Sequence, residues 1–350
     1  MRDVAVVGYA QRQTTDFDGS PTMVEMLVPI FQELYASTGL AKADIGFWCS
    51  GSSDYLAGRS FSFVQSVDAI GALPPVNESH VEMDAAWALY EAWLKIQTGE
   101  VDTALVYGFG KSSAGTLRRT LALQFDPITM TPIWPDTVSV AGIQARLGLE
   151  SGAWTEEQMA EVVNRSLSDA ESNEYAVRKG GSSVSDLLAR PMYADPLRKH
   201  DCAPVTDGAA AIVLAAEDRA YEICERPAWI TGLSHRVDPL HLGSRSLTES
   251  PSARAAAASL DLTGVEIAEL HAPFSHQEII LRREAGLGDD VRINPSGGAL
   301  ASNPMFTAGL NRFGEAAKRV WDGTATKVLA HATSGPALQQ NLFCTMEGKN

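Results

Sequence analysis

The sequence predicts an α/β protein made of two duplicated βαβ-rich halves, with a large loop region inserted in the first half. The main observation is an internal repeat, because the strand-like segment 4–9 recurs at 228–233 and the segment 104–108 recurs at 328–332. Segments with helical apolar spacing separate these short, apolar, β-rich segments. Strands that alternate with helices in this way are typical of βαβ units around a buried sheet. We therefore expect buried, mostly parallel sheets.

The repeat also places the helices and strands along the chain. In the first half, a helix is expected over 23–38, a strand over 44–48 and a second helix over 84–96. In the second half, a helix at 252–260 and a strand at 266–270 match the first two of these segments.

The chain divides into three parts on this basis. Residues 1–110 together with 200–224 form the first half, residues 111–199 form the inserted loop region, and residues 225–350 form the second half. Such a long excursion from a compact sheet is more often functional than idle.

Composition restricts the class of protein. The chain has 350 residues, of which 45% are hydrophobic and 20% are charged, which is typical of a protein with a large core and excludes a disordered or fibrous one. No apolar stretch reaches the roughly 18 residues that span a bilayer, and the N-terminus has no secretory leader pattern. We expect a cytoplasmic protein that does not bind membranes.

Charge and cysteine content exclude two further classes. With 43 acidic against 28 basic residues the net charge is −15, which opposes binding to nucleic acid. The cysteines lie far apart and form no CxxC pair: Cys49, Cys202, Cys224 and Cys344. This spacing predicts free, mostly buried thiols in a reducing compartment and no metal site.

Three motifs in the later part of the chain resemble those of one family. They are segment 195–211, segment 270–275 with the sequence Leu-His-Ala-Pro-Phe-Ser, and segment 294–304 with the sequence Asn-Pro-Ser-Gly-Gly-Ala-Leu-Ala-Ser-Asn-Pro. The second and third resemble the His-Asp-Cys-Phe and Gly-Gly…Gly-His-Pro blocks of the thiolase superfamily. The pattern is most similar to sterol-carrier-protein-type thiolases, the lipid-transfer proteins of bacterial sterol catabolism. The resemblance implies the thiolase fold, with its layers in the order αβαβα.

The resemblance also implies a mechanism whose main groups are missing here. In the family, a cysteine thiolate at the start of a buried helix accepts the acyl group, a histidine of the Gly-His-Pro block activates it, and a second cysteine moves a proton. An ungapped match places Glu82 at the first cysteine, with Asp84 close behind it, and Asn303 at the histidine. Cys344 is a poor second cysteine because it lies in an apolar run beyond the turn at 334–336. Cleavage through an acyl-cysteine is therefore not expected.

The candidate catalytic residues are Glu82, Asp84, His271 and Asn303. Either acid is a candidate general base; the alternative is that both only stabilise the first turn of a helix. The resemblance places His271 near the thioester oxygen; otherwise it is a hydrogen-bonded core histidine. Asn303 either donates a hydrogen bond to that oxygen or caps the helix that follows, with Pro304 at its first position.

Gly297, Gly298 and Ser296 are the candidate residues for binding the CoA part of a substrate. Two adjacent glycines allow close backbone approach to a ligand or unusual dihedral angles. No covalently bound cofactor is expected, since CoA enters only as part of the thioester.

These residues indicate a protein that acts on or binds acyl-CoA thioesters in lipid or sterol side-chain catabolism. Retro-aldol cleavage of a 3-hydroxyacyl-CoA fits best, because it needs a base and an oxyanion site but no acyl carrier. The alternatives are a catalytically silent subunit that supports an active partner, and an acetyl-CoA acyltransferase of the family's usual kind. The expected partners are a second copy or another thiolase-like chain, and a small zinc-ribbon and OB-fold protein of the kind that accompanies thiolase-like aldolases.

Overall fold

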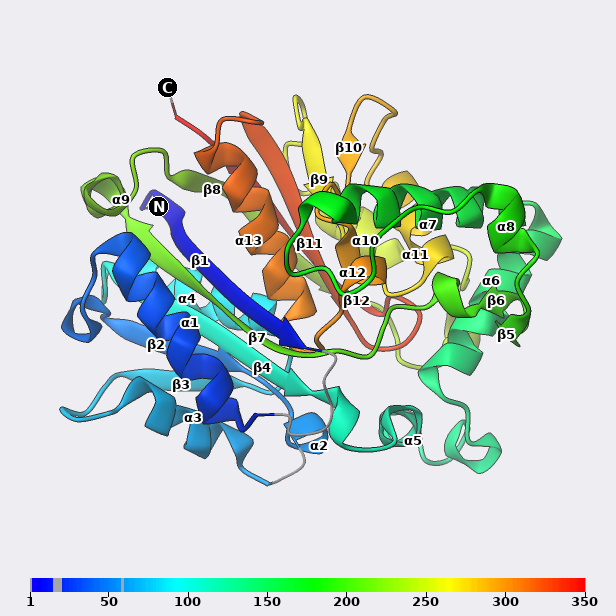
Figure 1. The fold of residues 1–350 in the computed structure, drawn as a ribbon, viewed down its shortest axis with the longest axis horizontal. Helices are drawn as coiled ribbons and strands as arrows, with labels where there is room; N and C mark the ends of the chain where they lie inside the picture. Colours follow the sequence, from blue (N-terminus) through cyan, green and yellow to red (C-terminus); the bar gives the residue numbers. More distant parts are fainter. Residues whose placement is uncertain (1, 15–20, 58–59, 350) are drawn as a thin grey trace.

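A large mixed sheet runs through the protein (Figure 1), whose structure is a computed structural model that describes residues 2–14, 21–57 and 60–349. The order of its strands is β10-β9-β11-β12-β8-β1-β7-β4-β2-β3. The strands, including the small hairpin β5-β6, are β1 (Val4–Thr14), β2 (Phe47–Gly51), β3 (Glu78–Val81), β4 (Thr103–Lys111), β5 (Met192–Ala194), β6 (Leu197–Arg198), β7 (Asp207–Ala216), β8 (Ala228–Val237), β9 (Ile267–Glu269), β10 (Arg292–Ile293), β11 (Lys327–Ser334) and β12 (Gln340–Glu347).

Helices cover both faces of this sheet. They are α1 (Met23–Thr38), α2 (Asp54–Ala57), α3 (Ser62–Ile70), α4 (Ala85–Gln97), α5 (Leu117–Ala122), α6 (Thr137–Ser151), α7 (Glu156–Asp169), α8 (Val184–Leu188), α9 (Glu217–Ile223), α10 (Pro251–Ala257), α11 (Ser275–Glu284), α12 (Gly298–Ala301) and α13 (Ala308–Trp321). Within the residues that the structure describes, no helix is both long enough and apolar enough to cross a membrane.

The duplication is visible in the order of the strands. The first half contributes β3-β2-β4-β7-β1, and the second contributes the equivalent set β10-β9-β11-β12-β8. The two sets meet edge to edge, where β1 and β8 pair antiparallel at Ala5–Trp229 and Val6–Ala228. The repeat in the sequence therefore matches equivalent strands, β1 with β8 and β4 with β11.

The expectation of mostly parallel sheets is wrong. β2 is parallel to β3 and β4, and β9 is parallel to β10 and β11, but the other neighbouring strands of the large sheet pair antiparallel. Only residues 335–339 link β11 to β12, and a link this short joins antiparallel strands, because a parallel pair needs a crossover of a dozen or more residues. A strand buried on both faces reads as an apolar run in either direction, so its pattern does not reveal its orientation.

The layers αβαβα follow from strands that bury both faces. Along β4, Ala104 and Val106 pack with α4 and α13, whereas Leu105 and Tyr107 pack with α1 on the opposite face. In the second half, the strand residues that pack with α4 and α13 alternate with those that pack with α10 and α11. α4 and α13, one from each half, therefore form the middle layer.

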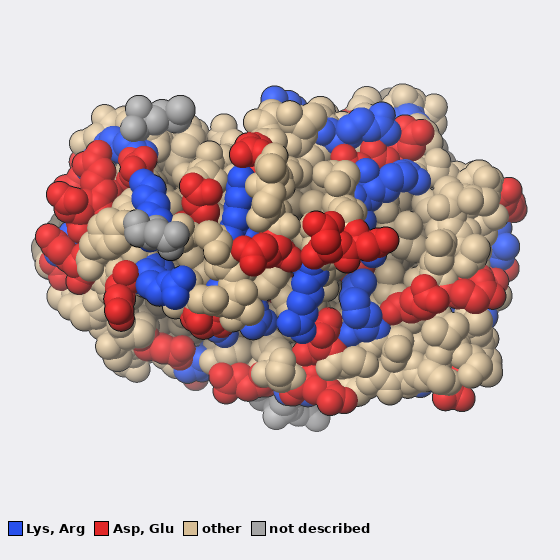
Figure 2. Space-filling model, turned by 90° about the horizontal axis from the view of Figure 1, so that it is seen from above, with Lys and Arg blue, Asp and Glu red and all other residues tan. Residues whose placement is uncertain are grey.

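The inserted region lies against the second half. Figure 1 shows α5 to α8 on the side of the molecule away from α1 and α3. Trp154 and Met159 pack in one apolar cluster with residues of α10 and α11, so the insertion covers the outer face of the second half. Figure 2 shows acidic and basic side chains interspersed on the face seen from above, without a broad basic surface among the described residues there.

A close backbone crossing joins the two halves at the carboxyl ends of β2 and β4. The N–H of Ala85, at the start of α4, donates a hydrogen bond of 2.8 Å to the carbonyl oxygen of Phe306. Gly108 and Gly110 on β4 make room for this crossing, because a Cβ at Gly110 would collide with the carbonyl oxygen of Met305. Segment 303–306 can therefore lie directly over the end of β4.

Replacing Gly110 by alanine should displace this crossing. Overpacking of a well-packed contact costs about 1–3 kcal/mol, so we expect G110A to lower the free energy of unfolding by that amount in urea denaturation. G115A is the matched control, since a Cβ at Gly115 has nothing within 4 Å. A G110A protein as stable as G115A would show that the segment has room to move.

Candidate active site

The two segments singled out in the sequence, 82–84 and 302–304, lie close together in the structure. Each lies just before one end of the Ala85–Phe306 hydrogen bond of 2.8 Å, at the carboxyl ends of the parallel strands β2 and β4. Ligands of α/β sheets usually bind outside the carboxyl ends of parallel strands. The candidate site therefore lies at the edge of the sheet where ligands usually bind.

Asp84 binds the starts of both central helices. The residue is only 5% exposed, and its carboxylate accepts hydrogen bonds from the backbone N–H groups of Ala86 (2.9 Å), Gly309 (2.9 Å) and Leu310 (3.0 Å). Burial raises the pKa of Asp84, and the three N–H groups oppose that shift. The capping interpretation is confirmed for α4, and the same carboxylate also serves α13.

Glu82 has a different environment although it lies in the same segment. Its side chain is 56% exposed, and Oε2 lies 3.5 Å from Nε2 of His80. Oε1 accepts a hydrogen bond of 3.3 Å from the backbone N–H of Asp54. Of the two candidate acids, Glu82 is therefore the one that a substrate can reach.

His271 and Asn303 form a hydrogen-bonded pair. Nε2 of His271 lies 3.1 Å from Oδ1 of Asn303, and the backbone N–H of Thr333 on β11 donates to Nδ1 of the same ring at 3.4 Å. Because Nδ1 accepts, the ring proton lies on Nε2 and the amide oxygen of Asn303 accepts it. Burial lowers the pKa of His271 to about 4, so the imidazole is neutral at pH 7.

Asn303 does not cap a helix, and that interpretation is wrong. α13 begins only at Ala308, with Thr307 at the N-cap position. The intervening residues form a turn, in which the N–H of Thr307 donates to the carbonyl oxygen of Pro304 at 3.1 Å. The proline therefore begins a turn and not a helix.

The amide group of Asn303 keeps its donors free. The backbone N–H of Asn303 donates to Oγ1 of Thr206 at 3.2 Å, which fixes the position of segment 302–304. Oδ1 accepts the ring proton of His271. Within the described residues, the N–H bonds of Nδ2 have no acceptor, so they remain for a ligand.

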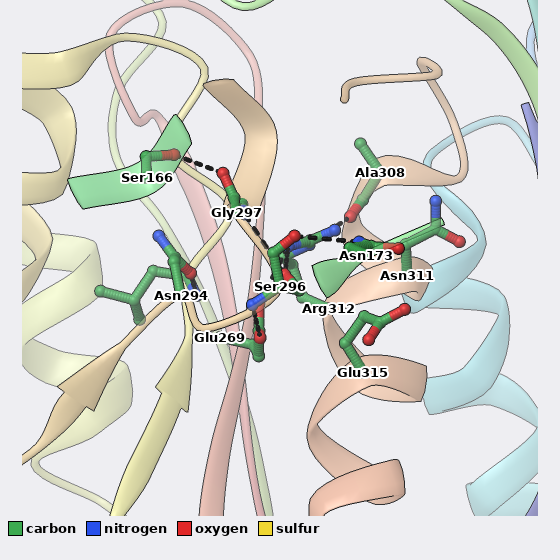
Figure 3. A network of polar contacts seen from close by, with 12 residues as sticks. Ser166, Asn173, Glu269, Asn294, Ser296, Gly297, Ala308, Asn311, Arg312 and Glu315 are labelled. Atoms are coloured by element: carbon green, nitrogen blue, oxygen red, sulfur yellow. Dashed lines mark hydrogen bonds and ion pairs between the residues drawn. The ribbon is translucent and has the colours of Figure 1, made fainter. Parts of the chain in front are cut away.

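Ser296 and the two glycines that follow it belong to a buried polar network (Figure 3). Ser296 donates its hydroxyl to Oε2 of Glu269 (2.6 Å) and its backbone N–H to Oε1 (2.9 Å). The guanidinium of Arg312 donates to Oγ of Ser296 (2.6 Å) and to Oε2 of Glu269 (2.9 Å). The Ser296 hydroxyl is thus committed to a buried ion pair.

The glycine pair is required by the backbone. Gly297 and Gly298 have φ values of +91° and +59°, and a Cβ on Gly297 would lie 2.6 Å from the Cβ of Ala170. The hydroxyl of Ser166 donates to the carbonyl oxygen of Gly297. The unusual dihedral angles are confirmed, and a contact of these residues with CoA stays a prediction.

The sequence analysis missed Glu269 and Arg312. They are 0% and 3% exposed, and burial raises the pKa of Glu269 while Arg312 opposes that shift. The available signal was a charged residue inside otherwise apolar segments, Ile-Ala-Glu-Leu at 267–270 and Gly-Leu-Asn-Arg-Phe at 309–313. A charge that is buried needs a buried partner, so two such residues predict each other.

The structure separates the candidate catalytic residues into groups. His271 and Asn303 are in contact, whereas Asp84 is occupied by helix N–H groups. In the part of the chain that the structure describes, Glu82 has no hydrogen bond or ion pair with either His271 or Asn303. A ligand that lies between the two segments is needed to link them.

The cysteines offer no acyl carrier at this site. Cys49 on β2 and Cys344 on β12 are 0% exposed, and burial raises the pKa of both thiols, to about 12 for Cys49. All cysteines are free, and Cys224 is the one that is only partly buried. Among the described residues, no group of His, Cys, Asp and Glu is arranged to hold a metal ion.

Comparisons with known proteins find an acetyl-CoA acetyltransferase and sterol carrier protein 2 among the proteins of similar sequence. An acetyl-CoA acetyltransferase of Methanothermobacter thermautotrophicus is 24% identical over 92% of this chain and 91% of its own length. Sterol carrier protein 2 of Bos taurus is 24% identical over 77% of this chain and 59% of its own length. No family model matches the chain.

Solved structures decide the fold. The human mitochondrial 3-ketoacyl-CoA thiolase in complex with CoA superimposes with a TM-score of 0.80 at 14% identity, over 100% of this chain and 98% of that chain. The chain has the thiolase fold. The Ltp2-ChsH2(DUF35) aldolase matches this thiolase fold with a TM-score of 0.79 at 17% identity, over 98% of both chains. The sequence relatives and the thiolase fold together support the resemblance to the thiolase superfamily.

Replacing Asp84 by alanine should destabilise the whole thiolase fold. The change removes a helix cap, worth about 1 kcal/mol, and leaves buried N–H groups without an acceptor, at about 1–3 kcal/mol each. We expect D84A to lose at least about 3 kcal/mol in urea denaturation. T155A is the control because Thr155 caps α7 at an exposed position, so it should lose only about 1 kcal/mol. Equal losses in the two variants would contradict a link between the halves through Asp84.

Acid should destabilise the protein through its buried histidines. Burial lowers the pKa of His271 from 6.5 to about 4 and the pKa values of His276 and His331 to about 3. At pH values between these folded-state pKa values and 6.5, the unfolded chain binds more protons than the folded protein. The free energy of unfolding is therefore highest above pH 6.5 and falls as the pH decreases. We expect the Tm to fall between pH 6.5 and 4, and H331Q to weaken that dependence. The exposed His241 provides the control, H241Q, and a pH dependence that is the same in both variants would contradict the assignment.

Proposed function

We propose that the chain is a lyase of the thiolase fold that cleaves a 3-hydroxyacyl-CoA by a retro-aldol reaction. The observation that carries this proposal is the His271–Asn303 pair, 3.1 Å apart, beside a segment that has Glu82 where the family's mechanism needs a thiol. The pair supplies neutral hydrogen-bond donors, and Glu82 supplies an accessible base. A retro-aldol reaction needs both and needs no acyl carrier.

In the proposed reaction, Glu82 accepts the proton of the 3-hydroxyl group. The hydroxyl oxygen becomes a carbonyl oxygen as the bond between Cα and Cβ breaks, and the electron pair of that bond forms an enolate on the thioester. Nδ2 of Asn303 donates hydrogen bonds to the enolate oxygen. Cα then takes the proton back from Glu82, which yields a shorter acyl-CoA and an aldehyde or ketone.

His271 contributes by orienting the amide of Asn303. The ring is neutral at pH 7, and the N–H of Thr333 occupies Nδ1, so Nε2–H is the one ring donor. Only the amide oxygen can accept from that donor, and this holds Nδ2 in the opposite orientation. Donors held in place before charge develops on an oxygen typically contribute about 10²–10³-fold to the rate.

The acyltransferase alternative conflicts with the positions of the thiols. Relatives of the chain are named acetyl-CoA acetyltransferases, and an acyl-cysteine mechanism needs an accessible thiol of low pKa. Burial instead raises the pKa of Cys49 and Cys344 in strands of the sheet. Retro-aldol cleavage avoids this conflict, and an aldolase is among the proteins of the same fold.

The substrate and partners follow from the same relatives as proposals. We take the acyl chain to be a lipid or sterol side-chain fragment, in line with the match to sterol carrier protein 2. CoA is then present only as part of the substrate. We place the protein in the cytoplasm. Among the described strands, β3 is the outermost of the first half and pairs on one side only, so its other edge is available to a second thiolase-like chain, identical or different. The name of the Ltp2-ChsH2(DUF35) aldolase favours a small DUF35-type partner.

The proposal is tested with the purified protein and its co-purifying partners, by following release of the carbonyl product from 3-hydroxyacyl-CoA thioesters. We expect E82Q to lower kcat by at least about 100-fold, because the general base is lost. N303A should lower kcat/KM by about 10²–10³-fold, because an oxyanion donor is lost. E100Q is the control, since Glu100 is an exposed acid that pairs with Lys95, and it should keep full activity.

Other outcomes assign the other functions. If complexes that contain E82Q or N303A cleave the 3-hydroxyacyl-CoA as fast as the unmodified complex, the lyase proposal is wrong. The chain is then a silent subunit whose partner is active. That second candidate is favoured by the absence, among the described residues, of a contact between Glu82 and the His271–Asn303 pair. Cleavage of a 3-ketoacyl-CoA that depends on free CoA thiol would identify an acyltransferase.

A further inference from the structure

One histidine of the site region has no part in the proposed reaction. His80 lies on β3, and its side chain is 13% exposed. Nδ1 lies 2.9 Å from Oγ of Ser50 on the neighbouring strand β2, and Nε2 lies 3.5 Å from Oε2 of Glu82. The ring of Phe63 on α3 stacks on the imidazole, with centroids 4.8 Å apart and an interplanar angle of 15°. The Ser50 contact at Nδ1 and the stacked ring of Phe63 therefore fix the orientation of His80. Nε2 has no hydrogen-bond partner among the described residues and lies at ion-pair distance from Glu82.

Acidic groups surround this imidazole. Glu82 lies 3.5 Å from the ring, and His80 also interacts electrostatically with Glu78 on the same strand and with Asp54 on α2. Glu78 accepts a hydrogen bond of 3.4 Å from Ser50, and burial raises its pKa while Ser50 and His80 oppose the shift. The histidine is thus the partner that three carboxylates share.

The two anchors of Glu82 determine where its carboxylate lies. Oε1 accepts from the backbone N–H of Asp54 at 3.3 Å, and Oε2 faces Nε2 of His80 at 3.5 Å. The side chain is more than half exposed, so little else restrains it. Without the imidazole, only the hydrogen bond from Asp54 would remain.

We infer that His80 is a positioning residue that holds Glu82 in place for proton removal. This inference rests on the proposed function, because it assumes that Glu82 is the base. A displacement of about 1 Å in a catalytic group can cost about 100-fold in rate. An exposed carboxylate at the end of a flexible side chain therefore gains from a second anchor.

Ser50 keeps the ring of His80 turned toward Glu82. Its hydroxyl lies 2.9 Å from Nδ1, and a ring held at Nδ1 directs Nε2 to the other side, toward Oε2 of Glu82. Nε2 has no hydrogen-bond partner within the described residues, so its contact with Glu82 is an ion pair of the imidazolium form.

The kinetic test compares H80A and H80Q in the purified complex. We expect H80A to lower kcat by about 10–100-fold with little change in KM. H80Q keeps an N–H donor and should recover part of kcat, and H241Q should match the unmodified protein. An H80A protein with unchanged kcat would overturn the inference, and so would an H80Q protein whose kcat is no higher than that of H80A.

A second test needs no catalysis. The ring ¹⁵N resonances of His80, assigned by their loss in H80Q, are compared between the unmodified protein and E82Q at pH 7. We expect E82Q to shift the Nε2 resonance of His80 more than any resonance of the other histidines, and unchanged His80 resonances would overturn the inference even in an active protein. If the resonance shifts but no 3-hydroxyacyl-CoA is cleaved, the contact stands, and the proposed function fails together with the positioning role.

Discussion

The carboxylate of Asp84 is the interaction on which the rest of the site depends. It accepts hydrogen bonds from the first turns of α4 and α13, the central helices of the two halves. The first N–H groups of a helix have no partner within the helix, and a buried helix start must find acceptors in the protein. One acid satisfies two helices here, which holds the crossing of Ala85 and Phe306 and so brings the segments of Glu82 and Asn303 together.

Burial gives the two acids of one short segment different roles. Asp84 is enclosed between two helices, and its oxygens accept from three N–H groups. Glu82 is more than half exposed, and its carboxylate contacts only the N–H of Asp54 and the ring of His80 among the described residues. The His271–Asn303 pair likewise depends on burial: loss of solvent keeps the imidazole neutral, and the N–H of Thr333 at Nδ1 leaves Nε2–H to donate to the amide oxygen. The result is a site with oriented neutral donors and an accessible carboxylate. Proton transfer suits these groups better than acyl transfer.

The local sequence pattern predicted the structure correctly where buried segments are also repeated in the chain. The duplicated apolar segments predicted the α/β class and the equivalence of β1 with β8, and the glycine pair at 297–298 predicted unusual dihedral angles. Strand direction was not predictable, since a strand buried on both faces is apolar in either orientation. The cap assigned to Asn303 was wrong for a related reason: Asn-Pro begins a turn as readily as a helix, and Ala308 is where α13 begins.

The sequence by itself determined the α/β class and the duplication, because these follow from apolar periodicity. The layered arrangement and the candidate site residues came from the resemblance to thiolases, and the roles of those residues stay predictions. Only the tertiary structure showed that Asp84 is buried against two helix starts and that Glu82 is exposed, since both acids read alike beside a helix start and differ in what surrounds them. It also decided that Glu269 and Arg312 form a buried pair and that His80 faces Glu82. Each of these contacts depends on which segments come together in space. The local sequence pattern does not show this, because the segments are distant in the chain or lie on separate strands.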